Sequence, residues 1–212
     1  MSAMGLKERI YLFFVRFAHY RIVARLKKLF NFRHSDKDDG LVKLNLGCGD
    51  KILKHFINVD VVASRAGFEP DVLCDLKKLD FEDNYADEIL SVHVIEHFYR
   101  WEVEAVLAEW FRVLKPGGKI VLECPNILHA AKMTLVKEKD LDKINGRVKE
   151  TLWVFYGDPR WVDPYMVHRW GYSPRSLSKL LLDAGFINVR RRASLFKRRE
   201  PRDMRLEAYK PL

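Results

Sequence analysis

Cysteine is scarce in this chain, and long uncharged apolar runs are missing. The 212 residues include three cysteines, and no two of them form a Cys-x-x-Cys pair. This excludes a disulfide scaffold and a cysteine-based zinc site. No stretch reaches the roughly 20 apolar residues that a spanning helix needs. The apolar stretch at residues 10–15, which Arg16 closes, is too short for a secretory signal. We therefore expect a cytoplasmic protein with no metal site.

Acidic residues are outnumbered, but only at the two ends of the chain. In total, 38 Lys and Arg face 29 Asp and Glu, for a net charge of +9. Residues 1–33 carry a net +7 and residues 190–212 a net +6, so residues 34–189 carry −4. A basic total would by itself indicate nucleic acid or an anionic membrane. Because residues 34–189 are mildly acidic, the net positive charge indicates what the two ends contact. It does not indicate what a site in the middle of the chain binds.

The chain divides into a short extension and one larger domain. Apolar residues recur at three- and four-residue steps over roughly residues 4–31, which predicts one or two amphipathic helices. We expect residues 1–40 to be this basic helical extension with its linker, and residues 41–212 to be the domain. The basic segment 1–33 could rest peripherally on the anionic inner membrane surface. The alternative that we favour is that the apolar face of these helices packs against the chain's own sheet or against a second copy in a homodimer.

Residues 41–212 alternate between strand and helix patterns. Short buried strands are expected at 41–46, 56–61, 71–75, 88–93 and 119–124, and a closing antiparallel hairpin at 186–190 and 204–209. A helix is expected from residue 103 to 114, stopped by Lys115-Pro-Gly-Gly118, and a second one between Ser173 and Gly185. Strands separated by crossovers predict an α/β domain with a mostly parallel, doubly wound sheet. Residues 126–172 form a variable insert rich in aromatic residues.

The residues at the carboxyl ends of these strands converge on one expected pocket. Gly47 and Gly49 allow a tight turn after the first strand, and Asp60 ends the second strand. Glycine turn and acid together indicate adenosine binding. Asp50 stands beside the loop, where it would repel a pyrophosphate but tolerate a cation such as the sulfonium of S-adenosyl-L-methionine (SAM). Asp60 follows Gly49 by eleven residues, which leaves little room for a first crossover helix.

Five motifs occur in order in the first half of the domain. Residues 44–50 read LNLGCGD, 58–60 NVD, 74–76 CDL, 92–98 VHVIEHF and 114–119 LKPGGK. This series resembles class I SAM-dependent methyltransferases, strongly over residues 41–125. The resemblance implies a Rossmann-like seven-stranded sheet with an antiparallel strand seven. It departs from the family at Asn45, where an acid is common, and in the truncated first helix.

The resemblance also implies a cofactor site for SAM, with S-adenosyl-L-homocysteine as the product. The glycine turn would lie along the methionine part of SAM, Asp60 would take the ribose, Asp75 and Leu76 would flank the adenine, and His93 would close the site. For Asp75, an ordinary loop role is about as expected. The implied cofactor residues are Leu46, Gly47, Cys48, Gly49, Asp60, Val61, Cys74, Asp75, Leu76 and His93.

The aromatic insert is the expected acceptor site. Trp and Tyr faces stack on sugars or planar aromatics, while Asp, His and Arg bind hydroxyl groups. His168 is our preferred catalytic base and His97 the second candidate; either could instead be a structural histidine bonded to backbone. About half of the aromatic residues are expected to pack on one another as a lid. The expected substrate-binding residues are Tyr99, Trp153, Tyr156, Tyr165, Arg169 and Trp170.

These observations predict O-methylation of a saccharide or another small hydroxylated acceptor. The spacing of the glycine turn, Asn58-Val-Asp60 and His168-Arg-Trp-Gly-Tyr-Ser173 resembles methyltransferases associated with bacterial surface-polysaccharide synthesis. One alternative is an RNA methyltransferase that grips phosphates with its basic ends, although no Asn/Asp-Pro-Pro-Tyr/Phe motif follows the fourth strand. Another is a non-catalytic interaction protein with the SAM fold.

Overall fold

The computed structural model describes residues 39–63, 67–136, 149–159, 161–196 and 202–212. The helices predicted over residues 4–31, and the basic segment 1–33 with its proposed membrane or dimer contact, lie outside the described residues. No helix within the described ranges is long and apolar enough to cross a membrane.

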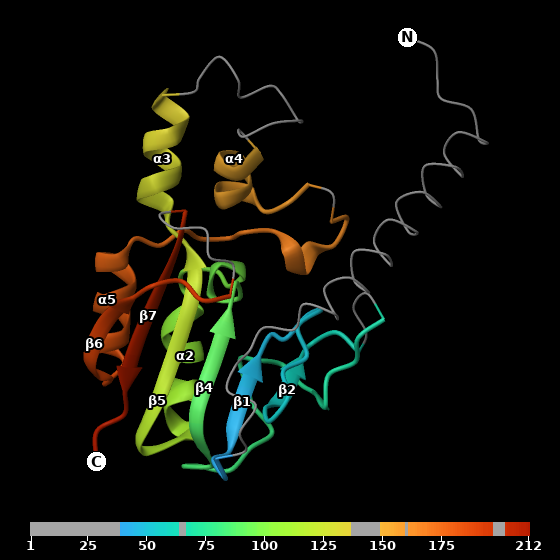
Figure 1. Ribbon diagram of the computed structural model, residues 1–212, viewed down its shortest axis with the longest axis vertical. Helices are drawn as coiled ribbons and strands as arrows, with labels where there is room; N and C mark the ends of the chain where they lie inside the picture. The colour runs from blue at the N-terminus through green and yellow to red at the C-terminus, as the bar shows by residue number, and fades with distance from the viewer. Residues whose placement is uncertain (1–38, 64–66, 137–148, 160, 197–201) are drawn as a thin grey trace, which may run out of the picture.

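A single seven-stranded sheet organises the domain (Figure 1). The strand order is β3-β2-β1-β4-β5-β7-β6; β1 to β5 run parallel, and β7 is antiparallel to both β5 and β6. The predicted sheet with an antiparallel strand seven is thus confirmed. The strands are β1 (Lys43–Leu46), β2 (Ile57–Asp60), β3 (Val72–Leu73), β4 (Ala86–Val92), β5 (Leu114–Pro125), β6 (Ile187–Arg192) and β7 (Asp203–Tyr209).

One face of the sheet holds most of the core. The inward residues of α2 (Val103–Val113) and α5 (Pro174–Asp183) join the strands in one apolar cluster. Trp110 of α2 is fully buried there and its Nε1–H donates to the carbonyl oxygen of Leu76. Leu90, Val92 and Val121 belong to a second, smaller cluster. Their alternation with the residues of the first cluster along β4 and β5 places the two clusters on opposite faces.

Two further helices lie beyond the carboxyl ends of β4 and β5. These are α3 (Ile127–Val136) and α4 (Lys149–Tyr156), which pack against each other (Figure 1). The short 3-10 helices η1 (Ile95–His97) and η3 (Pro164–Met166) lie in the loops at the same end. The predicted variable insert therefore stands over the end of the sheet where ligands of such folds bind.

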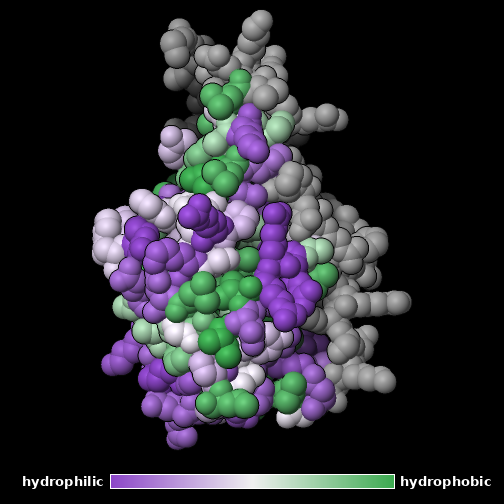
Figure 2. Space-filling model, turned by 90° about the vertical axis from the view of Figure 1, so that its left-hand side faces the viewer, coloured by the Kyte–Doolittle hydropathy of each residue, from purple (hydrophilic) through white to green (hydrophobic). Residues whose placement is uncertain are grey.

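The edges of the sheet carry features that discourage pairing with another chain. β3 has only two residues, and Arg190, Arg191 and Arg192 of β6 are exposed. Short edge strands and charged edge side chains both oppose edge-to-edge association. Figure 2 faces the side of the molecule with α5 and β6, where hydrophilic side chains cover much of the surface and apolar ones form a patch in the middle and another near the top.

Side-chain amides hold the connection where the first crossover helix was expected to be truncated. The described residues between β1 and β2 contain no helix. Instead, Asn58 Oδ1 accepts from the Leu53 N–H, and Asn58 Nδ2 donates to the carbonyl oxygens of Leu53 and Phe56. Asn45 Nδ2 donates to the carbonyl oxygen of Lys51 and to Asn58 Oδ1. A carboxylate at position 45 could not make these donations, which explains the departure from the family pattern.

The helix ends confirm one expectation and correct another. Ser173 caps α5 in a capping box with Ser176, and Gly185, at φ +94°, accompanies a Schellman ending. In contrast, the glycines after α2 do not end that helix. α2 ends at Val113, and Leu114 already has extended geometry and begins β5. Gly117 instead belongs to β5, and its N–H donates to the carbonyl oxygen of Lys210 after β7.

Candidate active site

The glycine turn and Asp60 are joined directly. The Gly49 N–H donates to Asp60 Oδ2 over 2.7 Å, and the Val62 N–H donates to Asp60 Oδ1 over 3.1 Å. Asp60 is 7% exposed at the carboxyl end of β2. Each carboxylate oxygen can accept a second hydrogen bond, so Asp60 can orient the turn and still accept from two ribose hydroxyls. Ribose binding by Asp60 stays a prediction.

The turn itself requires its glycines. Gly47 and Gly49 have φ values of +69° and +53°, in the left-handed region that favours glycine. A Cβ at Gly47 would lie 2.3 Å from Cγ2 of Val94, just after β4. The turn is held from behind, since the N–H groups of Gly47 and Cys48 both donate to the carbonyl oxygen of Val59. The glycine turn therefore packs closely against the loop that carries the histidines.

The remaining predicted cofactor residues differ in how exposed their side chains are. Leu46, Cys48, Cys74 and Leu76 are buried, so a ligand would meet mainly their backbone. Val61 is half-buried. All three cysteines are buried, and none of them forms a disulfide.

Asp75 is exposed and forms a local turn. Its Oδ1 accepts from the Lys77 N–H, and its Oδ2 lies 3.9 Å from Lys77 Nζ. This matches the loop role that was kept open for Asp75, and its contact with the adenine stays a prediction.

His93 is fixed between two buried acids. It has a φ of +57°; its Nδ1 lies 3.2 Å from Glu96 Oε1 and its Nε2 lies 3.6 Å from Asp203 Oδ2. Glu96 is 2% exposed and Asp203 fully buried. The ring is thus held by β7 as well as by its own loop, and its proposed role in closing the cofactor site remains a prediction.

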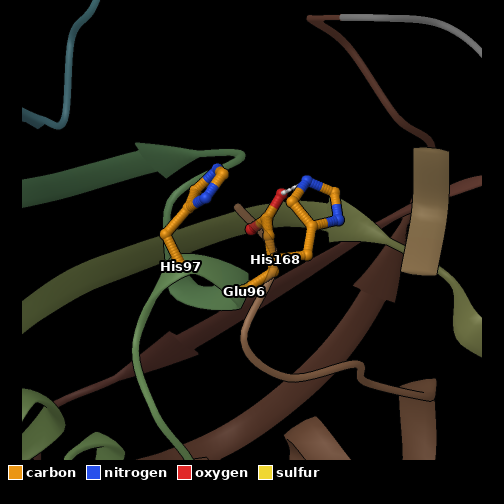
Figure 3. Close-up of side chains that lie close together, drawn as sticks. All are labelled: Glu96, His97 and His168. Carbon is orange, nitrogen blue, oxygen red and sulfur yellow. Dashed lines mark ion pairs between the residues drawn. The ribbon is translucent and has the colours of Figure 1, made fainter. Parts of the chain in front are cut away.

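Glu96, His97 and His168 form one cluster at the end of β4 (Figure 3). Oxygen and nitrogen atoms of the three side chains all lie within 4.8 Å of one another, and His168 Nε2 is 3.9 Å from Glu96 Oε1. The rings of His97 and His168 meet edge to face, with centroids 4.9 Å apart. The two catalytic candidates, 71 positions apart in the chain, are therefore neighbours.

Backbone carbonyls fix the tautomer of both rings. Nδ1 of His97 lies 3.0 Å from the carbonyl oxygen of Val167, and Nδ1 of His168 lies 2.9 Å from that of Val154. A carbonyl only accepts, so Nδ1 carries the proton and Nε2 of a neutral ring keeps its lone pair. The structural role considered for each histidine is real, but it leaves Nε2 available for chemistry.

Burial and charge set the ionisation of the cluster. Burial acts to raise the pKa of Glu96, but its contact with His93 and the nearby His97 and His168 lower it to about 2. Burial lowers the pKa of His97, His168 lowers it further, and Glu96 partly opposes them. At neutral pH the cluster therefore contains a carboxylate beside an unprotonated His97.

Several predicted acceptor residues surround this cluster. Arg169 lies 4.9 Å from the ring centroid of Tyr99 and donates to the carbonyl oxygen of His97. The N–H groups of Arg169 and Trp170 donate to the carbonyl oxygen of Glu96. Trp170 is 48% exposed. The structure thus brings Tyr99, Arg169 and Trp170 together beside the histidines.

The other predicted acceptor residues are less closely tied to the cluster. Tyr165 of η3 and Tyr156 of α4 have exposed rings, while Trp153 of α4 is half-buried. The Tyr156 carbonyl oxygen accepts from the His168 N–H over 3.4 Å, so Tyr156 contacts the cluster through backbone. Acceptor binding by these three side chains stays a prediction.

Two residues of this region were missed from the sequence. Glu96 belongs to the quoted motif, but a glutamate in a loop is ordinarily exposed, and nothing local signals its burial. Trp101 stacks on Tyr99 with centroids 4.5 Å apart and an angle of 6° between the rings, and it is 76% exposed. The sequence signal that could have indicated Trp101 is its position two residues after Tyr99, which allows the two rings to stack.

Comparison with known proteins agrees with this geometry. Residues 44–122 match the family model of a methyltransferase domain. The chain is 42% identical over 53 residues to a ubiquinone/menaquinone biosynthesis C-methyltransferase of Cupriavidus taiwanensis, which is 25% of this chain and 21% of that protein. The match therefore spans about a fifth of that relative's length.

Solved structures share the fold across nearly the whole chain. A SAM-dependent methyltransferase of Archaeoglobus fulgidus is 19% identical, with a TM-score of 0.55 over 95% of this chain and 99% of that one. A possible histamine N-methyltransferase of Thermotoga maritima is also 19% identical, with a TM-score of 0.57 over 95% and 97%. The matched domain and the sheet order together identify a methyltransferase domain over residues 44–122, in a chain with the fold of SAM-dependent methyltransferases, and they support S-adenosyl-L-methionine as its cofactor.

Proposed function

We propose that this protein transfers a methyl group from SAM to a hydroxyl oxygen of a saccharide or another small hydroxylated acceptor. In this reaction the acceptor oxygen forms a bond to the methyl carbon as the bond from carbon to sulfur breaks. The sulfonium becomes the neutral thioether of S-adenosyl-L-homocysteine, and the hydroxyl proton leaves. The fold alone does not choose the acceptor, since the similar proteins carry names that refer to carbon and nitrogen methylation.

The observation that carries the proposal is the Glu96, His97 and His168 cluster beside the glycine turn. A hydroxyl is a weak nucleophile and needs help to lose its proton, worth roughly 10²–10⁴-fold in rate. β1 and β4 are neighbours in the parallel sheet, so the turn after one and the cluster after the other share one end. Contact between Gly47 and Val94 brings them together. An acceptor hydroxyl at the cluster would therefore lie near the methionine end of SAM.

The aromatic rim supports a ring-shaped acceptor. Tyr99 and Trp101 present a stacked pair with substantial exposure, and Arg169 lies against Tyr99. Flat exposed aromatic faces offer apolar contact to sugar rings or planar aromatics. Trp101 is the more exposed of the two, which makes its face the larger surface for a ring-shaped ligand.

The test is transfer of an isotopically labelled methyl group from SAM by the purified protein. Acceptor mixtures would be nucleotide-linked and lipid-linked saccharides, simple phenols and total RNA. We expect label in a saccharide or phenol fraction, and NMR of the product should show the methyl carbon bonded to oxygen. Label on RNA would favour the alternative that uses the basic ends. Methylation on nitrogen or carbon would overturn the proposed acceptor, and a protein that binds no SAM would overturn the enzymatic proposal.

A further inference from the structure

We propose that Glu96, His97 and His168 bind a divalent first-row transition-metal ion, with Zn²⁺ as the reference ion. The sequence analysis expected no metal here. The further statement that this ion would bind the acceptor hydroxyl rests on the proposed function. Metal binding itself does not, and it can be measured without SAM or acceptor.

The first support is the convergence of three potential ligand atoms. A carboxylate oxygen of Glu96 and one nitrogen from each ring lie within 4.8 Å of one another. Figure 3 shows the Glu96 carboxylate between the two imidazole rings. Tetrahedral bonds of about 2.1 Å would place neighbouring ligand atoms about 3.4 Å apart. Closing the longest separation would therefore take on the order of 1 Å, within reach of small side-chain rotations.

The second support is how the two histidines are held. Each uses Nδ1 on a backbone carbonyl, of Val167 for His97 and of Val154 for His168. Metal-binding histidines almost always donate their other ring N–H to such a partner, which fixes the ring orientation and strengthens the ligating nitrogen. Both rings are already oriented in this way, from two different loops.

The third support is the state of the Glu96 carboxylate. It is 2% exposed, and within the described part of the chain neither oxygen accepts a well-directed hydrogen bond. His93 Nδ1 lies 3.2 Å from Oε1. Leaving a buried carboxylate underbonded is costly, and a bound cation would satisfy it. His93 would then support the ligand from behind, as outer groups of metal sites do.

The ligand set points to the class of ion. Imidazole nitrogen suits Zn²⁺, Fe²⁺, Co²⁺ and related ions, whereas Mg²⁺ and Ca²⁺ prefer oxygen ligands. Two histidines and one carboxylate also leave at least one coordination position open, as catalytic sites of this composition do. That position would receive the acceptor hydroxyl, whose pKa a bound cation lowers. Tyr99 and Arg169, beside His97, would border it.

Metal uptake by the full-length chain, without a histidine tag, tests the inference. Protein stripped with a chelator would be titrated with Co²⁺, followed by visible absorption, and with Zn²⁺, followed by elemental analysis after desalting. We expect one ion per chain and weaker uptake of Mg²⁺. Glu96→Gln and His168→Gln should each weaken Co²⁺ and Zn²⁺ binding by at least about tenfold.

The matched control is His129→Gln, which changes a histidine of α3 outside the cluster and should leave uptake unchanged. Circular dichroism and SAM affinity would confirm that each variant folds. If Glu96→Gln does not fold, His168→Gln carries the test. No uptake by the wild-type chain, or full uptake by both cluster variants, overturns the site. If labelled transfer to oxygen proceeds fully in chelator, the role of the ion in binding the acceptor hydroxyl fails while the proposed function stands. If the ion binds but no transfer to oxygen is found, the metal site stands and the proposed function fails.

Discussion

The backbone N–H of Gly49 donates a 2.7 Å hydrogen bond to Oδ2 of Asp60 and thereby connects the turn after β1 to the end of β2. A single buried carboxylate thus orients the glycine turn and is also the predicted acceptor for the ribose hydroxyls. A change at Asp60 should therefore affect the cofactor site in two ways, through the turn and through the ligand.

Asp60→Ala should weaken SAM binding about 10- to 100-fold, because hydrogen bonds to a charged group contribute roughly 1.5–3 kcal/mol. Asp60→Asn, which keeps the shape and one acceptor oxygen, should lose less. Isothermal titration calorimetry with S-adenosyl-L-homocysteine measures both. Asp183→Ala is the matched control: it removes an exposed acid of α5 that pairs with Lys179, so a small effect is expected. An unchanged affinity in Asp60→Ala would contradict the ribose role.

Gly47→Ala should destabilise the chain and weaken SAM binding, since a Cβ there would lie 2.3 Å from Cγ2 of Val94 and the φ is +69°. The left-handed backbone alone costs roughly 1–2 kcal/mol. Gly40→Ala is the matched control, because Gly40 has a φ of +71° and nothing within 4 Å of its added Cβ. Urea denaturation should show a larger loss for Gly47→Ala than for Gly40→Ala.

The contact between Gly47 and Val94 can be tested by a second substitution. Val94→Ala removes both methyl groups that the new Cβ would meet, so the double variant should be less destabilised than the two single losses added together. If the losses of stability of the two single variants add exactly in the double variant, Val94 does not cause the destabilisation by Gly47→Ala.

Glu109→Gln should destabilise the protein by about 1–3 kcal/mol at pH 7. Glu109 of α2 accepts from the Leu79 N–H and binds Arg112 with both oxygens, while Arg112 also donates to the carbonyl oxygens of Leu79 and Phe81. The pair therefore attaches the loop before β4 to α2. Urea denaturation measures the change, and Glu104→Gln, at an exposed pair with Arg100, should cost little.

The same pair predicts a pH dependence. The hydrogen bond from Arg112 lowers the pKa of Glu109 from its usual 4.5, against the opposing effect of burial. The stabilisation is therefore complete above about pH 4.5 and is lost as the pH falls through the lower, folded-state pKa. The difference between wild type and Glu109→Gln should shrink accordingly in urea denaturation at acid pH. A constant difference would show that charge is not its source.

Trp101→Ala should raise the KM for the acceptor several-fold and leave the affinity for SAM unchanged. The ring is 76% exposed and stacks on Tyr99, so its loss removes about 1 kcal/mol of aromatic contact with a ring-shaped acceptor. The measurement is a kinetic titration with the acceptor that labelled transfer identifies. Leu135→Ala, at an exposed apolar residue of α3, is the control. Equal KM values for both variants would contradict a contact between Trp101 and the acceptor.

The positions of the strands and the glycine turn could be predicted because their signals are local. A buried strand shows as a short apolar run, an acid at a strand end is visible in the motif, and the Ser173-Pro174 start of α5 satisfies backbone groups within one turn. The strand that begins at Leu114 was harder to place. The end of α2 is set there by pairing with Ala86 of β4, a distant partner, rather than by the nearby glycines.

The sequence by itself therefore determined where the strands lie along the chain, the glycine turn and the acid at the end of β2, because each depends on residues close together in the chain. Only the tertiary structure decided that Glu96 is buried and that His97 meets His168. Burial of a loop carboxylate depends on what the rest of the chain places over it. The two histidines meet because the loop before α5 returns across the end of β4, where the backbone of Arg169 and Trp170 binds the carbonyl oxygen of Glu96.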